Sequence, residues 1–233
     1  MMVPVDFTML AQQCAPQVAP VTLAAIVRTE SGFNPYAIGV VGARLVRQPA
    51  SAAEAVATVH ELERQGWNYS VGLAQVNRSN FSRYGLGPET AFEPCRNVAA
   101  GAAILAGCFA KARTRSPDSQ EALRKSFSCY AAGDFVTGYR TGYVQRVVDN
   151  AAMHPIPVVP AIEPAIDPAM TPIRVQPLDA AGAGGGMPSQ AGAVGEQTGD
   201  ERAGSEVDPH ARKREGQPGD GEHDPLDSSA VAF

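Results

Sequence analysis

The sequence lacks the features that mark metal sites, membrane spans and export signals. Its four histidines are scattered and its four cysteines form no CxxC pair, so we expect neither a metal site nor a cofactor. No apolar run reaches the roughly 18 to 20 residues of a membrane-spanning helix, so we expect no membrane span. The first Lys or Arg is Arg28, and the N-terminus therefore lacks the basic region of a secretory signal peptide.

Apolar residues with regular spacing are also missing from the last third of the chain. Up to Met153 they recur at helical intervals, whereas from His154 the chain is rich first in Pro, then in Gly, then in charged residues. Such a composition cannot bury enough apolar surface to fold. We therefore expect a folded domain over residues 1–153 and a disordered, acidic tail over residues 154–233.

The charge is divided unevenly between these two parts. The domain carries 14 Lys and Arg against 11 Asp and Glu, a net of +3, and the tail carries 5 against 13, a net of −8. A net of +3 is too small to predict nucleic acid as a partner, and an ordinary solvated surface accounts for it.

The cysteines leave two interpretations open. Their even number is compatible with disulfides, while the position of Cys108 on the buried face of a helix also fits a free thiol. The sequence does not give a pairing for Cys14, Cys95, Cys108 and Cys129.

The spacing of apolar residues predicts a mainly α-helical domain. The stretch "AIGVVGARLVRQP" is the one strand signal and predicts at most a small β-hairpin. The expected helices cover residues 7–14, 20–30, a segment from the capping box at 51–54 to about Gly66, a segment capped by Asn97, a segment opened by Ser116 and Pro117, and residues 142–152.

Glu30 stands where a helical glutamate is rarely found. Leu23, Ile26, Val27 and Glu30 occupy positions i, i+3, i+4 and i+7 of one helix. Glu30 therefore shares the helical face that should be buried. Burial and the negative end of the helix dipole both favour the protonated carboxyl, so we expect a raised pKa, which suits a general acid. The alternative is an exposed Glu30 in a fraying helix end, with an ordinary pKa.

Four stretches, taken together and in this order, carry a resemblance to a known family: "ESGFNPYA" from Glu30, "VGLAQVN" from Val71, "EPCRNVAAGAAIL" from Glu93, and "CYAAGD" from Cys129, followed by "YVQRVV" from Tyr143. Together they resemble the lysozyme-like lytic transglycosylases that cleave peptidoglycan, over nearly all of residues 5–150. The long spacer between the first two motifs is most similar to the subfamily dedicated to type IV secretion systems.

The resemblance implies an α+β, lysozyme-like fold and a set of site residues. Ser31 would help to hold the site, and Tyr130 would reach toward the catalytic acid, although its position alone also fits a core aromatic. Ala131 departs from the many members that carry Asn there, which affects one polar contact but not the acid. The implied site consists of the catalytic acid Glu30 and the substrate-binding residues Ser31, Gly72, Gln75, Asn77 and Tyr130.

The resemblance also implies a reaction that needs one carboxylate. Most glycoside hydrolases use two, about 5 to 9.5 Å apart, and this chain offers no obvious second one, Asp134 being the nearest in sequence to a motif. A single Glu30 suffices to cleave the bond from N-acetylmuramic acid to N-acetylglucosamine if the muramyl C6 hydroxyl closes on C1 to give a 1,6-anhydro end. Tyr36, Trp67 and Tyr69 are candidates for stacking on the sugars, and a core position is the alternative for Trp67.

The expected partners are peptidoglycan glycan strands and, through the tail, subunits of a type IV secretion system, for whose assembly the wall would be opened locally. That role requires the periplasm, which the family resemblance implies although no export signal is visible. Two alternatives share the same sequence features: a hydrolytic muramidase that admits water, and a non-catalytic peptidoglycan-binding module that recruits secretion subunits.

Overall fold

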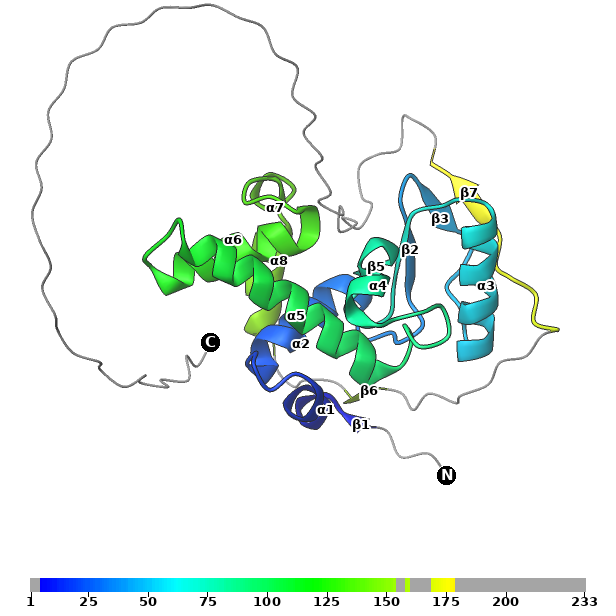
Figure 1. Cartoon of the computed structure of the whole chain (residues 1–233), viewed down its shortest axis with the longest axis horizontal. Coiled ribbons are helices and arrows are strands. Elements are labelled where there is room, and N and C mark those ends of the chain that lie inside the picture. The colour runs from blue at the N-terminus through cyan, green and yellow to red at the C-terminus, as the bar shows by residue number, and fades with distance from the viewer. Residues whose placement is uncertain (1–4, 154–157, 160–168, 179–233) are drawn as a thin grey trace, which may run out of the picture. The chain divides into compact units, whose positions relative to one another are not determined.

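The computed structural model describes residues 5–153, 158–159 and 169–178, and Figure 1 shows their helices and strands. Helices dominate, as predicted, beside a small antiparallel sheet. The helices are α1 (Phe7–Cys14), α2 (Pro20–Ser31), α3 (Ala52–Arg64), η1 (Arg78–Asn80), α4 (Phe81–Tyr84), α5 (Pro94–Arg113), α6 (Ser119–Ala132), α7 (Thr137–Arg140) and α8 (Tyr143–Ala151). The strands are β1 (Val5–Asp6), β2 (Ile38–Val40), β3 (Ala43–Leu45), β4 (Tyr69–Val71), β5 (Val76–Asn77), β6 (Val158–Val159) and β7 (Val175–Pro177).

The first helices begin and end where local chemistry directs. The Asp6 side chain accepts hydrogen bonds from the backbone N–H groups of Thr8 and Met9, so it caps α1. Pro20 opens α2, where a missing N–H costs nothing. Gly32 ends α2 in the left-handed conformation, with φ of 58°. The last turn of α2, which contains Glu30, is therefore fixed in place.

Two apolar cores lie on either side of the long helix α5. The first joins α1, α2, α6 and α8 and includes Phe7, Ile26 and Tyr143. The second lies between the sheet and α3 and includes Val59 and Tyr69. Helix α5 contributes Val98, Ala102 and Leu105 to the first core and Ala100 to the second, so it connects the two.

The main sheet has the strand order β5-β4-β2-β3-β7, and every neighbouring pair is antiparallel. The predicted hairpin is its centre, because β2 and β3 pair through Val40 and Ala43 across a two-residue turn. Three more strands extend it beyond that hairpin. Strands β4 and β5 carry the "YSVGLAQVN" stretch, so the sheet positions the second motif of the sequence.

The folded part extends past Met153, where the sequence predicted its end. Strand β6 pairs with β1 through Val159 and Val5, and β7 pairs with β3 through Val175 and Leu45. These strands were not predicted because each has only two or three residues, too few for an alternating pattern to stand out among prolines. Most of the predicted tail, residues 154–157, 160–168 and 179–233, lies outside the described residues.

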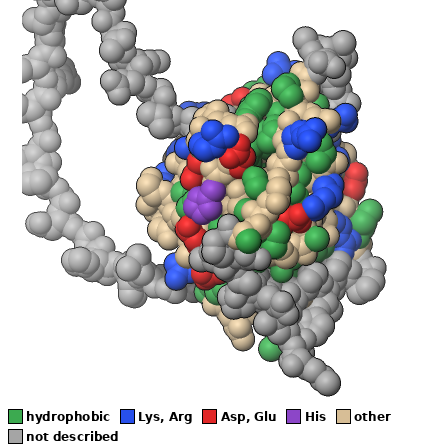
Figure 2. All heavy atoms as spheres, turned by 90° about the vertical axis from the view of Figure 1, so that its right-hand side faces the viewer, with side chains coloured by type: hydrophobic (Ala, Val, Ile, Leu, Met, Phe, Trp, Pro, Cys, Tyr) green, Lys and Arg blue, Asp and Glu red, His purple; other side chains and the backbone are tan. Residues whose placement is uncertain are grey.

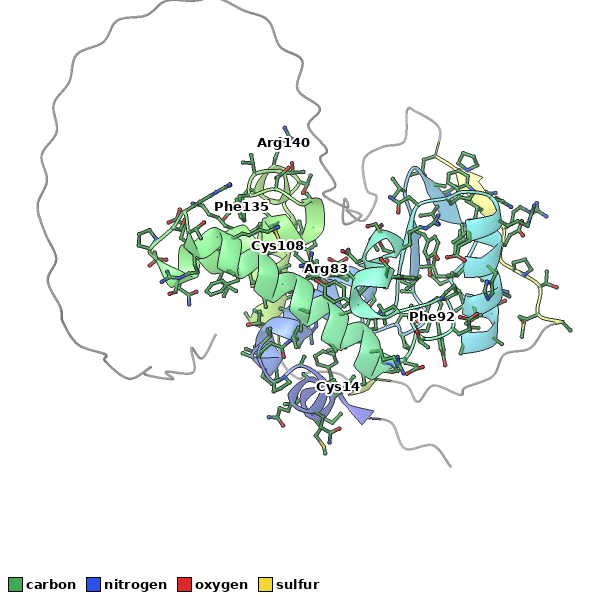
Figure 3. All side chains as sticks on the ribbon, in the orientation of Figure 1. Cys14, Arg83, Phe92, Cys108, Phe135 and Arg140 are labelled. Carbon is green, nitrogen blue, oxygen red and sulfur yellow. A yellow bond between two sulfur atoms is a disulfide. The ribbon has the colours of Figure 1, made fainter. Side chains whose placement is uncertain are left out.

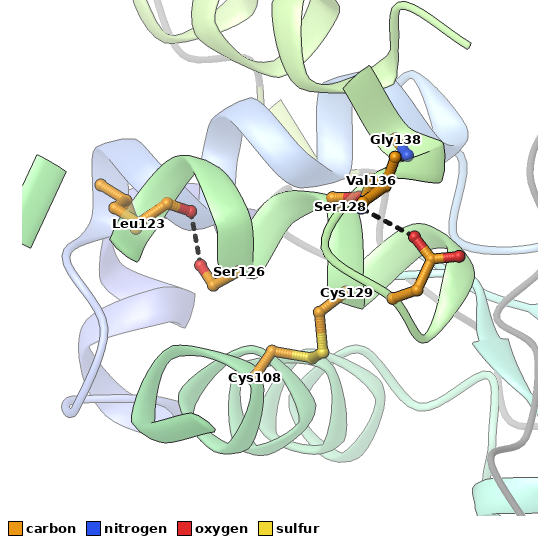
Figure 4. The surroundings of a disulfide bond; sticks show 8 residues. Cys108, Leu123, Ser126, Ser128, Cys129, Val136 and Gly138 are labelled. Carbon is orange, nitrogen blue, oxygen red and sulfur yellow. Dashed lines mark hydrogen bonds between the residues drawn. A yellow bond between two sulfur atoms is a disulfide. The ribbon is translucent and has the colours of Figure 1, made fainter. Parts of the chain in front are cut away.

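Two disulfides fasten the helices to one another, which excludes the alternative of free thiols. Cys14 joins α1 to the start of α5 by bonding Cys95, and Cys108 joins the middle of α5 to α6 by bonding Cys129. Figure 3 labels one cysteine of each bridge, and Figure 4 shows the second bridge between α5 and α6. Both bridges thus converge on α5.

Charges of both signs are interspersed on the surface that α3 presents, as Figure 2 shows. On this helix His60 lies 3.1 Å from Glu89, and Arg64 contacts Glu61 at 2.5 Å. A surface with alternating signs does not provide the continuous basic stripe that binds nucleic acid. None of the described helices is both long and apolar enough to cross a bilayer.

Candidate active site

Glu30 is buried near the end of α2, with 2% of its surface exposed. It therefore lies on the inward face that the apolar spacing predicted, and the alternative of a frayed, solvated helix end is excluded. The chain turns sharply just after it, because both Gly32 and Phe33 adopt positive φ, 58° and 67°. The Phe33 ring packs edge-on against Phe7 at 5.2 Å, which holds this turn against α1.

The hydroxyl of Tyr143, the first residue of α8, donates a hydrogen bond of 2.5 Å to Oε1 of Glu30. Burial raises the pKa of Glu30 from 4.5 to about 8, while the Tyr143 hydrogen bond and the positive charge of Arg146 act in the opposite direction. The loss of hydration therefore wins over both stabilising contacts. Burial likewise raises the pKa of Tyr143 well above its usual value, so its hydroxyl remains a donor.

Helix α8 is fixed on α2 by contacts next to Glu30. The Asn150 side chain donates to Oγ1 of Thr29 at 2.9 Å, and the Arg28 guanidinium donates to the carbonyl of Met153 at 3.3 Å. These contacts join the C-terminal end of α8 to the turn of α2 that carries the acid, while Tyr143 contacts Glu30 from the first residue of α8. The position of Tyr143 over Glu30 is thus set by the packing of two helices and not by one side chain.

The turn between β4 and β5 lies against the end of α2. Its residue Gly72 has φ of 77°, and a Cβ built there would lie 2.4 Å from Nδ2 of Asn97. The buried Asn97 amide donates to the carbonyls of Val71 and Ala91 at 2.9 and 2.8 Å and accepts the N–H of Ala74 at 2.8 Å. Gly72 is required here because Asn97 fills the space that a side chain would need.

The sequence prediction for Asn97 as a helix cap is wrong. Helix α5 begins at Pro94, so Asn97 lies inside the first turns and its amide points to the Gly72 turn. Asparagine is common at helix caps, and this preference outweighed the proline that in fact opens the helix. Sequence reasoning therefore missed a residue that holds the motif from Val71 to Ala74.

Two predicted site residues connect α2, the Gly72 turn and the sheet. The Ser31 hydroxyl donates to the carbonyl of Leu73 at 2.8 Å, so the residue after Glu30 is attached to this turn. Gln75 is buried, has φ of 45°, and donates from Nε2 to the carbonyls of Ala37 and Gly72, both at 3.0 Å. Its amide hydrogens are thus used within the protein, while its oxygen can still accept.

The other two predicted residues are also buried. The Tyr130 hydroxyl donates to the carbonyl of Ala74 at 2.6 Å, so Tyr130 supports the same turn from α6. The Asn77 side chain donates to Asn68 at 2.9 Å and accepts the N–H of Ser79 at 3.0 Å. The structure therefore gathers Ser31, Gly72, Gln75 and Tyr130 around one turn, while Asn77 organises the strand after it.

This arrangement agrees with the comparison of the sequence with protein families, in which the model of the transglycosylase SLT domain matches residues 7–150. The chain belongs to the transglycosylase SLT family. The resemblance to lytic transglycosylases that the four motifs predicted is confirmed. No solved structure matches the chain.

Relatives of this SLT domain protein carry names from secretion systems. It is 54% identical over 166 residues to "Type IV secretion system protein virB1" of Brucella suis biovar 1, a match that covers 68% of this chain and 70% of the relative. It is 38% identical over 158 residues to "Protein virB1" of Agrobacterium fabrum, covering 67% of this chain and 63% of that relative.

In this SLT domain the Tyr143 hydroxyl donates to Glu30, a contact that the sequence interpretation did not assign. Tyr130 and Tyr143 are both buried, and the Tyr130 hydroxyl donates to the carbonyl of Ala74. Sequence periodicity turned both residues inward but could not show that Tyr143 contacts the acid. The available signal was the "YVQRVV" motif, which begins at Tyr143.

The other carboxylates of the SLT domain have partners of their own. Asp134, the candidate second acid, accepts the Thr137 hydroxyl at 2.6 Å and the N–H groups of Thr137 and Val136 at 2.6 and 2.8 Å, and these bonds lower its pKa. In residues 5–153 the carboxylates engaged in caps, ion pairs or other side-chain hydrogen bonds are Asp6, Glu54, Glu61, Glu63, Glu89, Glu93, Asp118, Glu121, Asp134 and Asp149.

The aromatic residues considered for sugar stacking lie in different environments. Tyr69 is fully buried and its hydroxyl donates to Glu63 at 2.9 Å, so it belongs to the core beside α3 and offers no stacking surface. Tyr36 and Trp67 are half-buried against the same core. Among the described residues, no three His, Cys, Asp or Glu side chains gather as a site for a metal ion.

Proposed function

We propose that the chain is a peptidoglycan lytic transglycosylase in which Glu30 is the only catalytic carboxylate. It would cleave the β-1,4 bond from N-acetylmuramic acid to N-acetylglucosamine and leave a 1,6-anhydro end. The observation that carries this proposal is the burial of Glu30 in an SLT domain, which raises its pKa to about 8. A carboxyl with that pKa is protonated at neutral pH and is able to act as a general acid.

The chemistry begins with the neutral form of Glu30. Because Tyr143 donates to Oε1, the proton is expected on Oε2, the oxygen that then protonates the glycosidic oxygen as the bond to C1 breaks. The carboxylate that results takes the proton from the muramyl C6 hydroxyl, whose oxygen bonds to C1. The proton balance closes on one residue, which ends in its starting form, and no water is consumed.

Tyr143 and Arg146 would assist the second half of this cycle. After proton donation Glu30 is an anion in a buried site, where a charge without partners is costly. The Tyr143 hydroxyl and the Arg146 charge both favour this anion, since each lowers the pKa of Glu30. They therefore prevent burial from making the acid too weak a proton donor.

The partners of the remaining carboxylates support the choice of a transglycosylase over a hydrolase. A two-carboxylate mechanism needs a second acidic group available to a nucleophilic water or to the sugar. The candidate Asp134 instead accepts the N–H groups of Val136 and Thr137 at the start of α7. With Glu30 alone, an internal hydroxyl of the substrate is the nucleophile that the site supports best.

We assign supporting roles to the other predicted site residues. Ser31, Tyr130 and Asn97 hold the turn from Gly72 to Gln75, and we expect the backbone and the Gln75 oxygen of this turn to contact the sugars. Asn77 would act indirectly, by fixing strand β5, which follows this turn.

We propose that the reaction serves a type IV secretion system in the periplasm by opening the wall locally for its assembly. The names of the Brucella and Agrobacterium relatives support this assignment. The two disulfides support it independently, because such bonds persist in oxidising compartments such as the bacterial periplasm. Recruitment of secretion subunits by the chain is part of the same proposal.

Digestion of purified sacculi tests the function directly. The full chain, a Glu30→Gln variant and a Glu93→Gln variant as an exposed control are incubated with sacculi, and the products are read by mass spectrometry. Anhydro ends from the wild type and the control, absent with Glu30→Gln, are expected. Reducing ends would instead identify a hydrolytic muramidase, and sacculi that are bound but left intact would identify a binding module.

A further inference from the structure

One strand of the sheet comes from outside the SLT domain. In Figure 1, β7 lies at the sheet edge beside β3. The pairing is antiparallel and sets Leu45, Arg44 and Ala43 opposite Val175, Gln176 and Pro177. It is extended at both ends, because the N–H of Val46 donates to the carbonyl of Arg174 at 3.1 Å and the N–H of Leu178 donates to the carbonyl of Gly42 at 3.0 Å.

A single side chain anchors this segment. Ile173 is 5% exposed and belongs to the core between the sheet and α3. Its N–H donates to Oγ1 of the buried Thr58 at 3.0 Å, and that hydroxyl donates in turn to the carbonyl of Glu54. The neighbouring residues are exposed, apart from the half-buried Val175. The segment is therefore held by backbone pairing and one aliphatic pocket.

The contact is incomplete on the N-terminal side of Ile173. A hollow of about 390 Å³ is lined by Val46, Arg47 and Glu54 on the domain and by residues 169–174 on the segment. Arg47 and Glu54 form an ion pair there without help from the segment. The charged side chains on the domain side of this contact are thus paired without the segment. This is expected for a site that a strand occupies and not for a continuous core.

We propose that the edge of β3 and the pocket for Ile173 form a strand-binding site, and that residues 171–178 are its ligand, carried on the same chain. Extended peptides commonly bind proteins in this way, with backbone pairing along a sheet edge and a pocket for alternate side chains. The docked segment also covers an edge that would otherwise be open to pairing with other chains.

The site has a consequence for the part of the chain that follows. Leu178 is fixed beside Gly42, so the residue that precedes position 179 lies at the turn between β2 and β3. Residues 179–233 carry 11 Asp and Glu against 4 Lys and Arg, a net charge of −7. The strand-binding site therefore sets the point on the domain from which an acidic segment begins.

Peptide binding to the full chain tests the proposal. The probe is a fluorescein-labelled peptide with the sequence of residues 169–178, followed by fluorescence anisotropy. The variant Ile173→Asp detaches the chain's own segment and should bind the probe saturably. The wild type and a Gln176→Asp variant, which changes an exposed residue of the same strand, should bind it at least about tenfold more weakly, because the attached segment competes at high effective concentration. A probe that carries Ile173→Asp should not bind.

Absence of saturable binding to the Ile173→Asp chain, or equal binding to all three chains, would overturn the proposal. Hydrogen exchange on the wild type provides a second test that does not depend on a variant. The amides of Val46 and Leu178 should exchange at least about tenfold faster than that of Val41, which bonds Asn68 between the inner strands β2 and β4, because the segment detaches locally. Equal protection would mean that β7 is a permanent strand of the sheet and would reject a detachable ligand.

Discussion

The raised pKa of Glu30 predicts that the domain loses stability as the pH rises, by an amount that the structure allows us to work out. Below pH 4.5 the folded and unfolded states both hold the proton, and the group contributes nothing. Between pH 4.5 and about 8 the unfolded state has lost the proton while the folded state keeps it, so stability falls by about 1.4 kcal/mol per pH unit. The whole span corresponds to about 5 kcal/mol, and above it the loss stays constant.

The variant Glu30→Gln should remove this dependence, because Gln resembles the neutral acid and still accepts from Tyr143. Urea unfolding, followed by the fluorescence of the only tryptophan, Trp67, should give similar stabilities for both proteins at pH 4.5. At pH 8 the variant should be more stable by about 4 to 5 kcal/mol. The variant Glu93→Gln, at an exposed ion pair, controls for the loss of a carboxylate. Identical pH slopes for wild type and Glu30→Gln would refute a raised pKa at Glu30 and with it the case for a buried acid.

Three further predictions follow from the site and its supports. Activity on sacculi should fall about tenfold per pH unit above pH 8. In Tyr143→Phe this fall should move to higher pH, because the hydrogen bond that is lost lowers the pKa of Glu30. A pH profile that does not move would contradict the role of Tyr143. Gly72→Ala should lower the stability by about 2 kcal/mol or more and remove most of the activity, because its Cβ would meet Asn97. The control Gly66→Ala, with φ of 74° but nothing within 4 Å of the added Cβ, should cost only the backbone strain of about 1 kcal/mol and keep the activity. Equal losses for the two variants in urea unfolding and digestion would count against the Asn97 contact. Replacing both cysteines of the α1–α5 disulfide by serine should lower the stability by about 4.5 kcal/mol, against about 3.3 kcal/mol for the α5–α6 disulfide. The difference arises because the first disulfide closes a loop of 81 residues and the second a loop of 21. The reverse order in urea unfolding would refute loop closure as the main cause.

The burial of Glu30 was predictable because it depends on local spacing. A residue seven positions after Leu23 on one helix shares its face wherever the helix packs, and α2 packs that face inward. The helices over 7–14 and 20–30 were predictable for the same reason, since their caps lie in the sequence next to them. Charge and burial at this position are both properties of one helix.

The contact of Tyr143 with Glu30 was not predictable in this way. Tyr130 and Tyr143 each lie on the buried face of a helix, and the partner of each hydroxyl depends on how α6 and α8 pack against α2 and the Gly72 turn. The same limit applies to Asn97, whose amide reaches a turn more than 20 residues away in sequence. Contacts between distant segments decide these roles, and no local pattern records them.

Strand β7 escaped prediction because its stability comes from its partner. Val175 and its neighbours have no periodicity long enough to be read as a strand, and Ile173 is buried only because α3 and β3 leave a pocket for it. A short segment that adds to an existing sheet edge gains its structure from backbone pairing, which depends little on side chains.

The most direct test of the central claim is the mass of the fragments released from sacculi in water labelled with heavy oxygen. If Glu30 drives attack by the muramyl C6 hydroxyl, the new ends are anhydro ends, lighter by one water than hydrolysed ends, and contain no heavy oxygen. Reducing ends that carry heavy oxygen would show that water is the nucleophile and would contradict the account.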